Sequence, residues 1–180
     1  VDMLRCELES APRIIKFSPD GRFAYLICEL KNYISVYTYK DGPRGPVFEL
    51  VQTISTLNEY HSKGSAACVL RFSRDWNYVL CSNAGDNSVG IFKIDRETGM
   101  LEKICILPVS GDYPKAADFF PDNRHIMALN HESNTMTIFR INYEKKYFSL
   151  WGKPLKVETP NCVLVSEIEE APKQIGRASC

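Results

Sequence analysis

The sequence predicts an all-β protein, a β-propeller of four-stranded antiparallel blades, and three observations support this prediction. A segment of 25 or so residues that begins at Phe17 recurs without gaps at Phe72 and Phe119. Each copy contains short strand patterns separated by turn residues, with no sustained helical periodicity. Four strands in each unit of 47–55 residues are typical of a propeller blade.

The first two strands of each repeat are defined by the turn between them. Asp20-Gly21 and Asp122-Asn123 are turn pairs suited to a tight link between antiparallel strands. The runs that follow, Phe23–Ile27 in the first repeat and Tyr78–Cys81 in the second, are apolar at every or nearly every position. Such runs predict a strand that is buried on both faces.

A recurring asparagine precedes the third strand of each repeat. Asn32, Asn87 and Asn134 are interpreted as turn formers rather than as ligands, because asparagine tolerates left-handed backbone. Alternating strands follow at 34–36, 89–91 and 136–138. The fourth strands are expected at 47–53, 100–104 and 147–150.

The domain organisation follows from this spacing. Residues 1–165 form a partial propeller with repeats at about 11–57, 66–110 and 113–158, and residues 166–180 form a polar tail. Partial strands of neighbouring blades are expected at both ends, over 1–9 and 159–165. Closed propellers need about four to eight blades. We therefore expect the remaining blades to come from the same protein or from a second chain.

Composition excludes several classes of function. Lys and Arg together number 22, as do Asp and Glu, so nucleic acid is not expected as a partner. No apolar run approaches the roughly 18 residues of a membrane helix. Seven cysteines, none at Cys-x-x-Cys spacing, indicate a reducing cytoplasmic location. The three histidines share no ligand spacing and Gly-rich phosphate loops are absent, so neither a metal nor a cofactor is expected.

Several motifs give the chain a family resemblance over roughly residues 10–165. They are Ala11-Pro12-Arg13, Phe17-Ser18-Pro19-Asp20-Gly21-Arg22, Cys28-Glu29-Leu30, Gln52-Thr53-Ile54-Ser55-Thr56-Leu57, Cys81-Ser82-Asn83 and Asp95-Arg96-Glu97-Thr98-Gly99. With these motifs the sequence resembles the lactonase family of seven-bladed propellers, which includes the propeller-type 6-phosphogluconolactonase and the carboxymuconate lactonizing enzyme. The resemblance implies that about three to three and a half of seven blades are present, from the C-terminal part.

The resemblance also implies an active site in the central cavity. The family carries Gly-Pro-Arg-His and Asn-Glu-Leu motifs in one blade and Ser-Asn-Arg in the next. Arg13 and Glu29 match the first two functional positions. Ile14, Cys28 and Ala84 stand where the family has His, Asn and the second Arg.

The residues themselves point to related chemistry. Arg13 falls on the innermost strand and Glu29 at the end of the second, two places that face the channel of a propeller at one rim. A guanidinium holds a carboxylate or phosphate through paired hydrogen bonds, and a carboxylate can act as a general base. The alternative interpretation is a structural ion pair that links two strands.

The same positions in the other repeats are Cys68 with Ala84 and Lys115 with His131. We therefore predict Glu29 and Arg13 as catalytic residues. Lys115, His131 and Asn83 are predicted to bind a small anionic lactone substrate. His61 is interpreted as part of a polar loop.

The leading hypothesis is a lactone hydrolase that acts on a sugar-acid lactone and resembles 6-phosphogluconolactonase. Two alternatives remain open. One is a non-catalytic propeller that binds an anionic metabolite or a protein on the same rim. The other is a cycloisomerase that forms or opens muconate-type lactones.

Overall fold

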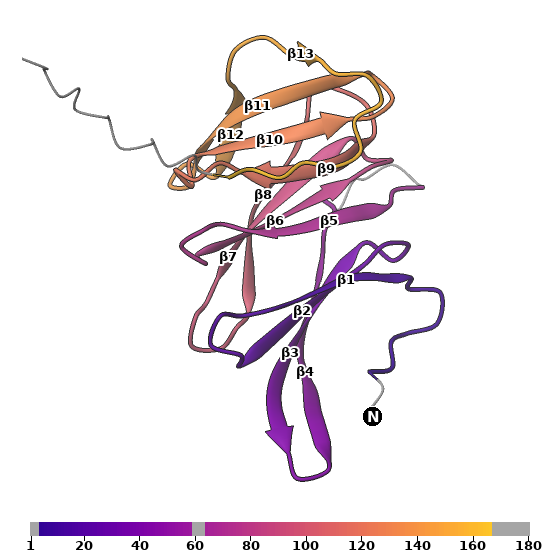
Figure 1. Cartoon of the computed structure of the whole chain (residues 1–180), viewed down its shortest axis with the longest axis vertical. Helices are drawn as coiled ribbons and strands as arrows, with labels where there is room; N and C mark the ends of the chain where they lie inside the picture. The colour runs from indigo at the N-terminus through magenta and orange to yellow at the C-terminus, as the bar shows by residue number, and fades with distance from the viewer. Residues whose placement is uncertain (1–3, 59–63, 167–180) are drawn as a thin grey trace, which may run out of the picture.

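The computed structural model describes residues 4–58 and 64–166, which fold into three antiparallel sheets without a helix (Figure 1). The first sheet, blade 1, contains β1 (Pro12–Phe17), β2 (Phe23–Cys28), β3 (Tyr33–Gly42) and β4 (Gly45–Ser55). Blade 2 contains β5 (Ala67–Phe72), β6 (Tyr78–Asn83), β7 (Ser88–Ile94) and β8 (Leu101–Pro108). Blade 3 contains β9 (Pro114–Phe119), β10 (His125–Asn130), β11 (Thr135–Asn142) and β12 (Tyr147–Leu150), and β13 (Leu155–Lys156) also pairs with β11. The prediction of an all-β fold with four-stranded units is confirmed.

The blades stand side by side with their first strands adjacent. Strand β5 contacts β1 on one side and β9 on the other, while β8 contacts β12 farther out. In each blade the strands follow chain order from the first outward. The first strands therefore line one inner side of the molecule, as they do around the axis of a propeller.

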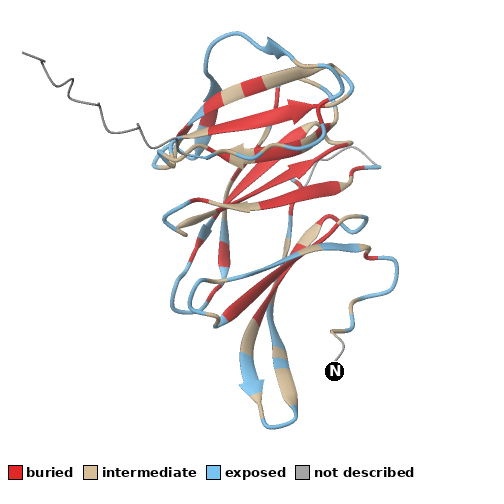
Figure 2. Ribbon diagram, in the orientation of Figure 1, coloured by how far each residue is buried: buried red, intermediate tan, exposed pale blue. Residues whose placement is uncertain are grey.

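The hydrophobic core lies between the blades. The second strands are the most deeply buried elements, and all six residues of β2 are buried (Figure 2). Tyr25 and Ile34 of blade 1 pack against Leu70 and Phe92 of blade 2. A second cluster joins blade 2 to blade 3 in the same way. Strands that are covered on both faces have no polar face, which explains the continuous apolar runs in the sequence.

The three recurring asparagines form turns, as predicted. Asn32, Asn87 and Asn134 have φ values of 52°, 52° and 53°, in the left-handed region that asparagine tolerates. Their side chains also bond to the segment that follows each blade, at Ser65 O, Tyr113 N and Thr159 N. In each blade, the asparagine thus forms the turn between the second and third strands and also anchors the segment that follows the blade.

The partial strands expected at the two ends are not formed within the described residues, and their pairing with further blades stays a prediction. Residues 4–11 and 157–166 contain no strand, because a strand needs a partner for its backbone groups and the described chain offers none there. Leu4 and Cys6 instead pack on the outer face of blade 1, against buried Leu26 and Tyr37.

The outermost strand of blade 3 is interrupted, which the sequence analysis missed. β12 pairs with the far half of β11, and β13 pairs with Thr135 and Met136 near its start. Gly152 has a φ of 81° and Pro154 lacks an N–H donor, so the chain leaves the ladder between the two strands. Residues 59–63 and 167–180, including the predicted His61 loop and nearly all of the predicted tail, lie outside the described residues.

Candidate functional site

The candidate site is built on a bulge that recurs at the start of the first strand in every blade. Pro12 pairs with Cys28 and Ile14 with Ile27, which leaves Arg13 as the extra residue of β1. The same shift leaves Cys68 extra in β5 and Lys115 extra in β9. A bulge re-aims the side chain it carries, and bulges are frequent beside active sites. The repeat therefore presents one re-aimed side chain per blade at the same rim.

Arg13 and Glu29 form an ion pair at this rim. The Arg13 Nη1 atom donates a 2.6 Å hydrogen bond to the Glu29 Oε2 atom. The side chains are 42% and 30% exposed, so a ligand can reach both. The hydrogen bond and charge of Glu29 raise the pKa of the Arg13 guanidinium, although partial burial opposes this. The alternative interpretation, an ion pair that links two strands, is therefore present in the structure. Because both side chains are partly exposed, the same pair can also contact a ligand.

The backbone on both sides holds Glu29 in place. The Glu29 N–H donates to the carbonyl of Ala11 at 2.8 Å, and the Glu29 carbonyl accepts from the N–H of Ala67 at 3.0 Å. The first bond closes the β1–β2 pair beyond the bulge. The second reaches the first residue of β5 in blade 2. Glu29 is therefore fixed at the junction of two blades.

Cys68 lies among the charged residues of the site. Burial raises the pKa of its thiol, the cations Arg13 and Lys115 oppose that rise, and Glu29 adds to it. The ring of Tyr113 lies 5.6 Å from the Lys115 ammonium, and Tyr113 also acts electrostatically on Arg13. Arg13, Glu29 and Lys115 therefore lie near enough to the buried thiol to act on it electrostatically.

Two predicted residues are placed differently. The His131 Nδ1 atom lies 3.3 Å from the carbonyl oxygen of Pro160, and among the described residues His131 makes no polar contact with the Arg13–Glu29 pair. Asn83 is fully buried, and its amide donates to the Thr56 carbonyl and to the Ser88 hydroxyl. The Asn83 side chain therefore fastens the end of β6 to blade 1. Substrate binding by these two residues stays a prediction.

Tyr113 is the site residue that the sequence analysis missed. Adding 102 to Ala11 gives Tyr113, and both have left-handed backbone, with φ values of 51° and 59°. Both carbonyls accept a hydrogen bond from the end of the second strand, from Glu29 and His131 respectively. An aromatic residue two positions before the Lys115 bulge was the available signal.

The rim has the groups needed to bind an anion, together with a carboxylate that could act as a base. Two cations come from two blades and one carboxylate lies against the first of them. Among residues 4–58 and 64–166, no three His, Cys, Asp or Glu side chains are grouped as they would be to hold a metal ion. The same residues contain no helix long and apolar enough to cross a membrane.

Comparison with known proteins identifies the family to which the chain belongs. A family described as "Lactonase, 7-bladed beta-propeller" matches residues 2–165. An uncharacterised protein of Lactococcus lactis is 30% identical over 164 residues, which are 91% of this chain and 48% of the relative. The 6-phosphogluconolactonase of Bacillus subtilis is 25% identical over 86% of this chain and 44% of its own. The chain spans about half the length of these relatives.

Solved structures agree on the fold. The periplasmic gluconolactonase of Pseudomonas aeruginosa superposes with a TM-score of 0.80 at 24% identity, over 88% of this chain and 43% of its own. A protein of Bacteroides fragilis that is provisionally assigned as a 6-phosphogluconolactonase superposes with a TM-score of 0.76 at 26% identity, over 88% of this chain and 43% of its own. The match over residues 2–165 shows that the chain belongs to the lactonase family of seven-bladed β-propellers.

Proposed function

We propose that the protein is a lactone hydrolase that acts on an anionic sugar-acid lactone at the bulged rim. The observation that carries this proposal is the exposed 2.6 Å pair of Arg13 and Glu29. Lys115, on the equivalent bulge of blade 3, adds a second cation at the same rim. The 6-phosphogluconolactonase of Bacillus subtilis among the relatives supports this choice of substrate class.

Glu29 is proposed as the general base. Its carboxylate takes a proton from water while the water oxygen attacks the lactone carbonyl carbon. The resulting tetrahedral intermediate carries its negative charge on the former carbonyl oxygen. The ring C–O bond then breaks, and the leaving alkoxide takes the proton back from Glu29. The product is the open-chain hydroxy acid, and water is the only reactant consumed besides the lactone.

The cations are proposed to divide two tasks. Arg13 touches Glu29 and is therefore close to the reacting oxygen, where a preorganised donor stabilises developing negative charge. Lys115 extends from the next blade but one and is suited to hold a second anionic group of the substrate. Ala84 stands where the family motif has arginine and is fully buried, so Lys115 is proposed to supply the second cation.

Completion of the cavity is part of the proposal. The first strands of three blades form only one side of a channel, and the relatives are about twice as long as this chain. We propose that the remaining blades of the same protein, or a second chain, close the ring and enclose the substrate.

A Glu29→Gln substitution in the intact protein tests the mechanism. Hydrolysis of phosphorylated and unphosphorylated sugar lactones is followed by acid release at constant pH. Loss of a general base is expected to lower kcat by about 100-fold or more. Glu49→Gln, on exposed β4 and paired with Lys40, is the matched control and is expected to keep full activity. Unchanged turnover in Glu29→Gln would refute the proposed role.

A non-catalytic binding function is the second candidate, and buried Ala84 in the family's arginine position is the observation that favours it. It predicts that the intact protein binds sugar-acid lactones in calorimetry without hydrolysing them. A cycloisomerase would instead act faster on muconate-type lactones than on sugar lactones. Adding muconate-type lactones to the substrate panel, and calorimetric binding to the kinetic assay, separates these three functions.

A further inference from the structure

A pocket lies between blades 1 and 2, at the opposite end of β1 and β2 from the Arg13–Glu29 pair. Its volume is about 320 Å³. Three segments form it: the β1–β2 turn at 18–22, the β5–β6 turn at 73–77 and the β7–β8 connection at 95–100. All three are complete in the described chain, so this pocket does not depend on further blades. The central lining residues are Arg22, Phe23, Tyr25, Trp76, Ile94 and Arg96.

One wall of this inter-blade pocket is an indole held in unusual backbone. Trp76 has a φ of 55°, a conformation that is rare for a bulky side chain. The equivalent turn positions of the other repeats hold Gly21 and Asn123, residues that adopt this conformation readily. Trp76 stacks on Phe72 with ring centroids 4.2 Å apart. The fold needs no aromatic residue at this turn, and the strained Trp76 points to a role in the pocket.

The junction between blades 2 and 3 shows that the pocket is not a general feature of the fold. Adding 47 to Arg96 gives Tyr143, which stacks on Tyr78 at 3.8 Å and donates to the Asn123 carbonyl. Tyr78 is in turn the counterpart of Phe23. The space that a tyrosine fills at the second junction is therefore left open at the first.

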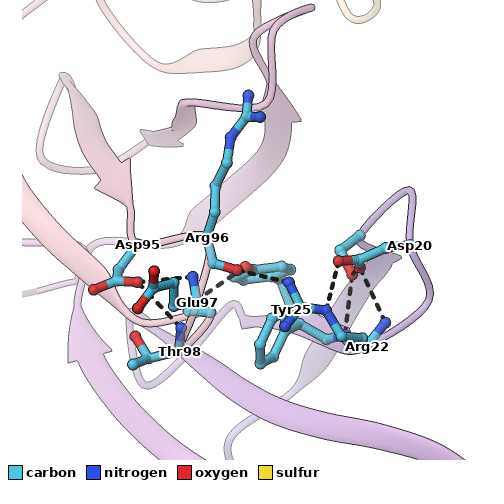
Figure 3. Close-up of polar contacts among 10 residues, drawn as sticks. Asp20, Arg22, Tyr25, Asp95, Arg96, Glu97 and Thr98 are labelled. Carbon is cyan, nitrogen blue, oxygen red and sulfur yellow. Dashed lines mark hydrogen bonds and ion pairs between the residues drawn. The ribbon is translucent and has the colours of Figure 1, made fainter.

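Two guanidinium groups and one carboxylate lie on the rim of the pocket. The Arg22 Nε atom donates to Asp20 at 2.7 Å, and Arg22 Nη2 donates to the carbonyl of Arg96 at 2.8 Å (Figure 3). The Arg96 guanidinium extends away from Arg22 and donates to the carbonyl of Asp75. Asp20 is the one carboxylate among the lining residues, against two guanidinium groups. Each arginine keeps further N–H donors for an anion.

The floor of the pocket is apolar and rigid. Phe23 and Tyr25 are buried, and the Tyr25 hydroxyl donates to the Gly99 carbonyl at 3.0 Å. Gly99 lies so close to the Phe23 ring that an added Cβ would fall 2.4 Å from it. Buried Ile94 completes the floor. The Arg22 guanidinium lies over the Phe23 ring, 5.0 Å from its centroid, so a flat apolar group would meet the floor beside this cation, with Trp76 as a further wall.

We propose that the inter-blade pocket binds a small aromatic carboxylate. The aromatic ring packs against Trp76 and the floor, and the carboxylate accepts hydrogen bonds from the Arg22 guanidinium, while Arg96 adds a second positive charge to the lining. Aromatic stacking combined with a charge-assisted hydrogen bond suits this ligand class, and the volume falls in the range of small-molecule sites. This site is separate from the proposed lactone site and does not rest on it.

Fluorine NMR of 4-fluorobenzoate with the intact protein tests the proposal. The probe signal is expected to broaden on binding, and benzoate is expected to compete. Benzamide, which lacks the charge, and cyclohexanecarboxylate, which lacks the aromatic ring, are expected to compete about tenfold more weakly or worse. Absence of broadening at millimolar probe, or equal competition by benzamide, would overturn the proposal.

Substitutions copied from the second junction locate the binding. Arg96→Tyr introduces the residue found at 143, and Trp76→Asn introduces the residue found at 123, so both suit the fold. Each is expected to abolish probe broadening while the circular dichroism spectrum and Tm stay close to those of the parent. Arg140→Gln is the control, because Arg140 also lies over a tryptophan, Trp151, away from this pocket. Binding that survives Trp76→Asn in folded protein would refute the site.

Discussion

Arg13 donates a 2.6 Å hydrogen bond to Glu29 across sixteen residues of sequence, because a bulge in β1 turns the guanidinium toward the end of β2. The bulge recurs at Cys68 and Lys115, so the pair belongs to a feature of every blade. In the other two blades the corresponding pairs are Cys68 with Ala84 and Lys115 with His131, neither of which forms such a bond among the described residues. Among the three described bulges, that of blade 1 is therefore the one whose side chain forms an ion pair with the end of the second strand.

Arg13→Lys is expected to separate the charge of Arg13 from its geometry. Lysine keeps the positive charge but cannot donate in the planar fork of a guanidinium. In the intact protein, kcat/KM for lactone hydrolysis is expected to fall by about tenfold, and by about 100-fold or more in Arg13→Met. Steady-state kinetics on the same lactone check both values. Equal activities of the two variants would show that the positive charge at this position has no role in the reaction.

Asn87→Ala is expected to destabilise the protein by about 2 kcal/mol. The Asn87 side chain donates to Asp112 and accepts from the Tyr113 N–H, and alanine loses both bonds while it keeps the left-handed backbone. Asn87→Gly is expected to cost less, because glycine removes the backbone strain. Urea denaturation of the two variants measures the difference. An alanine variant as stable as the glycine variant would contradict the role of φ at this turn.

Acid sensitivity is expected from Asp20. Hydrogen bonds from the Ser18 hydroxyl and from Arg22 lower its pKa from 3.8 to about 2. The folded state therefore holds the proton less tightly than the unfolded chain, so the stabilisation is complete above pH 4 or so and is lost as the pH falls through about 2. The effect is small because the Asp20 side chain is 48% exposed.

The measurement compares the parent with Asp20→Asn by chemical denaturation between pH 6 and pH 2. The stability gap between the two is expected to narrow as the solution is acidified. A gap that stays constant over that interval would rule out a lowered pKa for Asp20.

Cysteine reactivity is expected to differ sharply along the chain. Burial raises the pKa of Cys81 to about 12, whereas Cys162 is exposed. At pH 8 the Cys81 thiolate is scarce and shielded from reagents. Iodoacetamide is therefore expected to label Cys162 in the native protein and Cys81 only in urea, as read by peptide mass spectrometry. Equal labelling of both in the native protein would show that the blade 1–blade 2 core opens readily.

Particular residues show how far the sequence predicts the site. Arg13 and Glu29 were identified correctly as neighbours, because the repeat places them on adjacent strands and both match a family motif. Asn83 also matched a motif, yet its side chain is buried under Thr56 of the preceding blade. The repeat gives a residue's position within a blade. It does not show which face of that position the neighbouring blade covers.

The inter-blade pocket shows the same limit of what the sequence predicts. Trp76 is recognisable in the sequence as the odd member of a set that otherwise holds Gly21 and Asn123. Its partners Arg22 and Arg96 lie 54 and 20 positions away, and the β7–β8 connection brings them together by bonding to the turn of blade 1. No local pattern encodes a contact of this kind.

The sequence by itself determined the repeat, the strands and the turns, because these depend on local rules: apolar runs, aspartate and asparagine at turns, and a fixed spacing. The tertiary structure decided which side chains are re-aimed by bulges, which are sealed between blades and where space is left open. Those outcomes depend on how two twisted sheets pack against each other, and packing joins residues that are far apart in the chain.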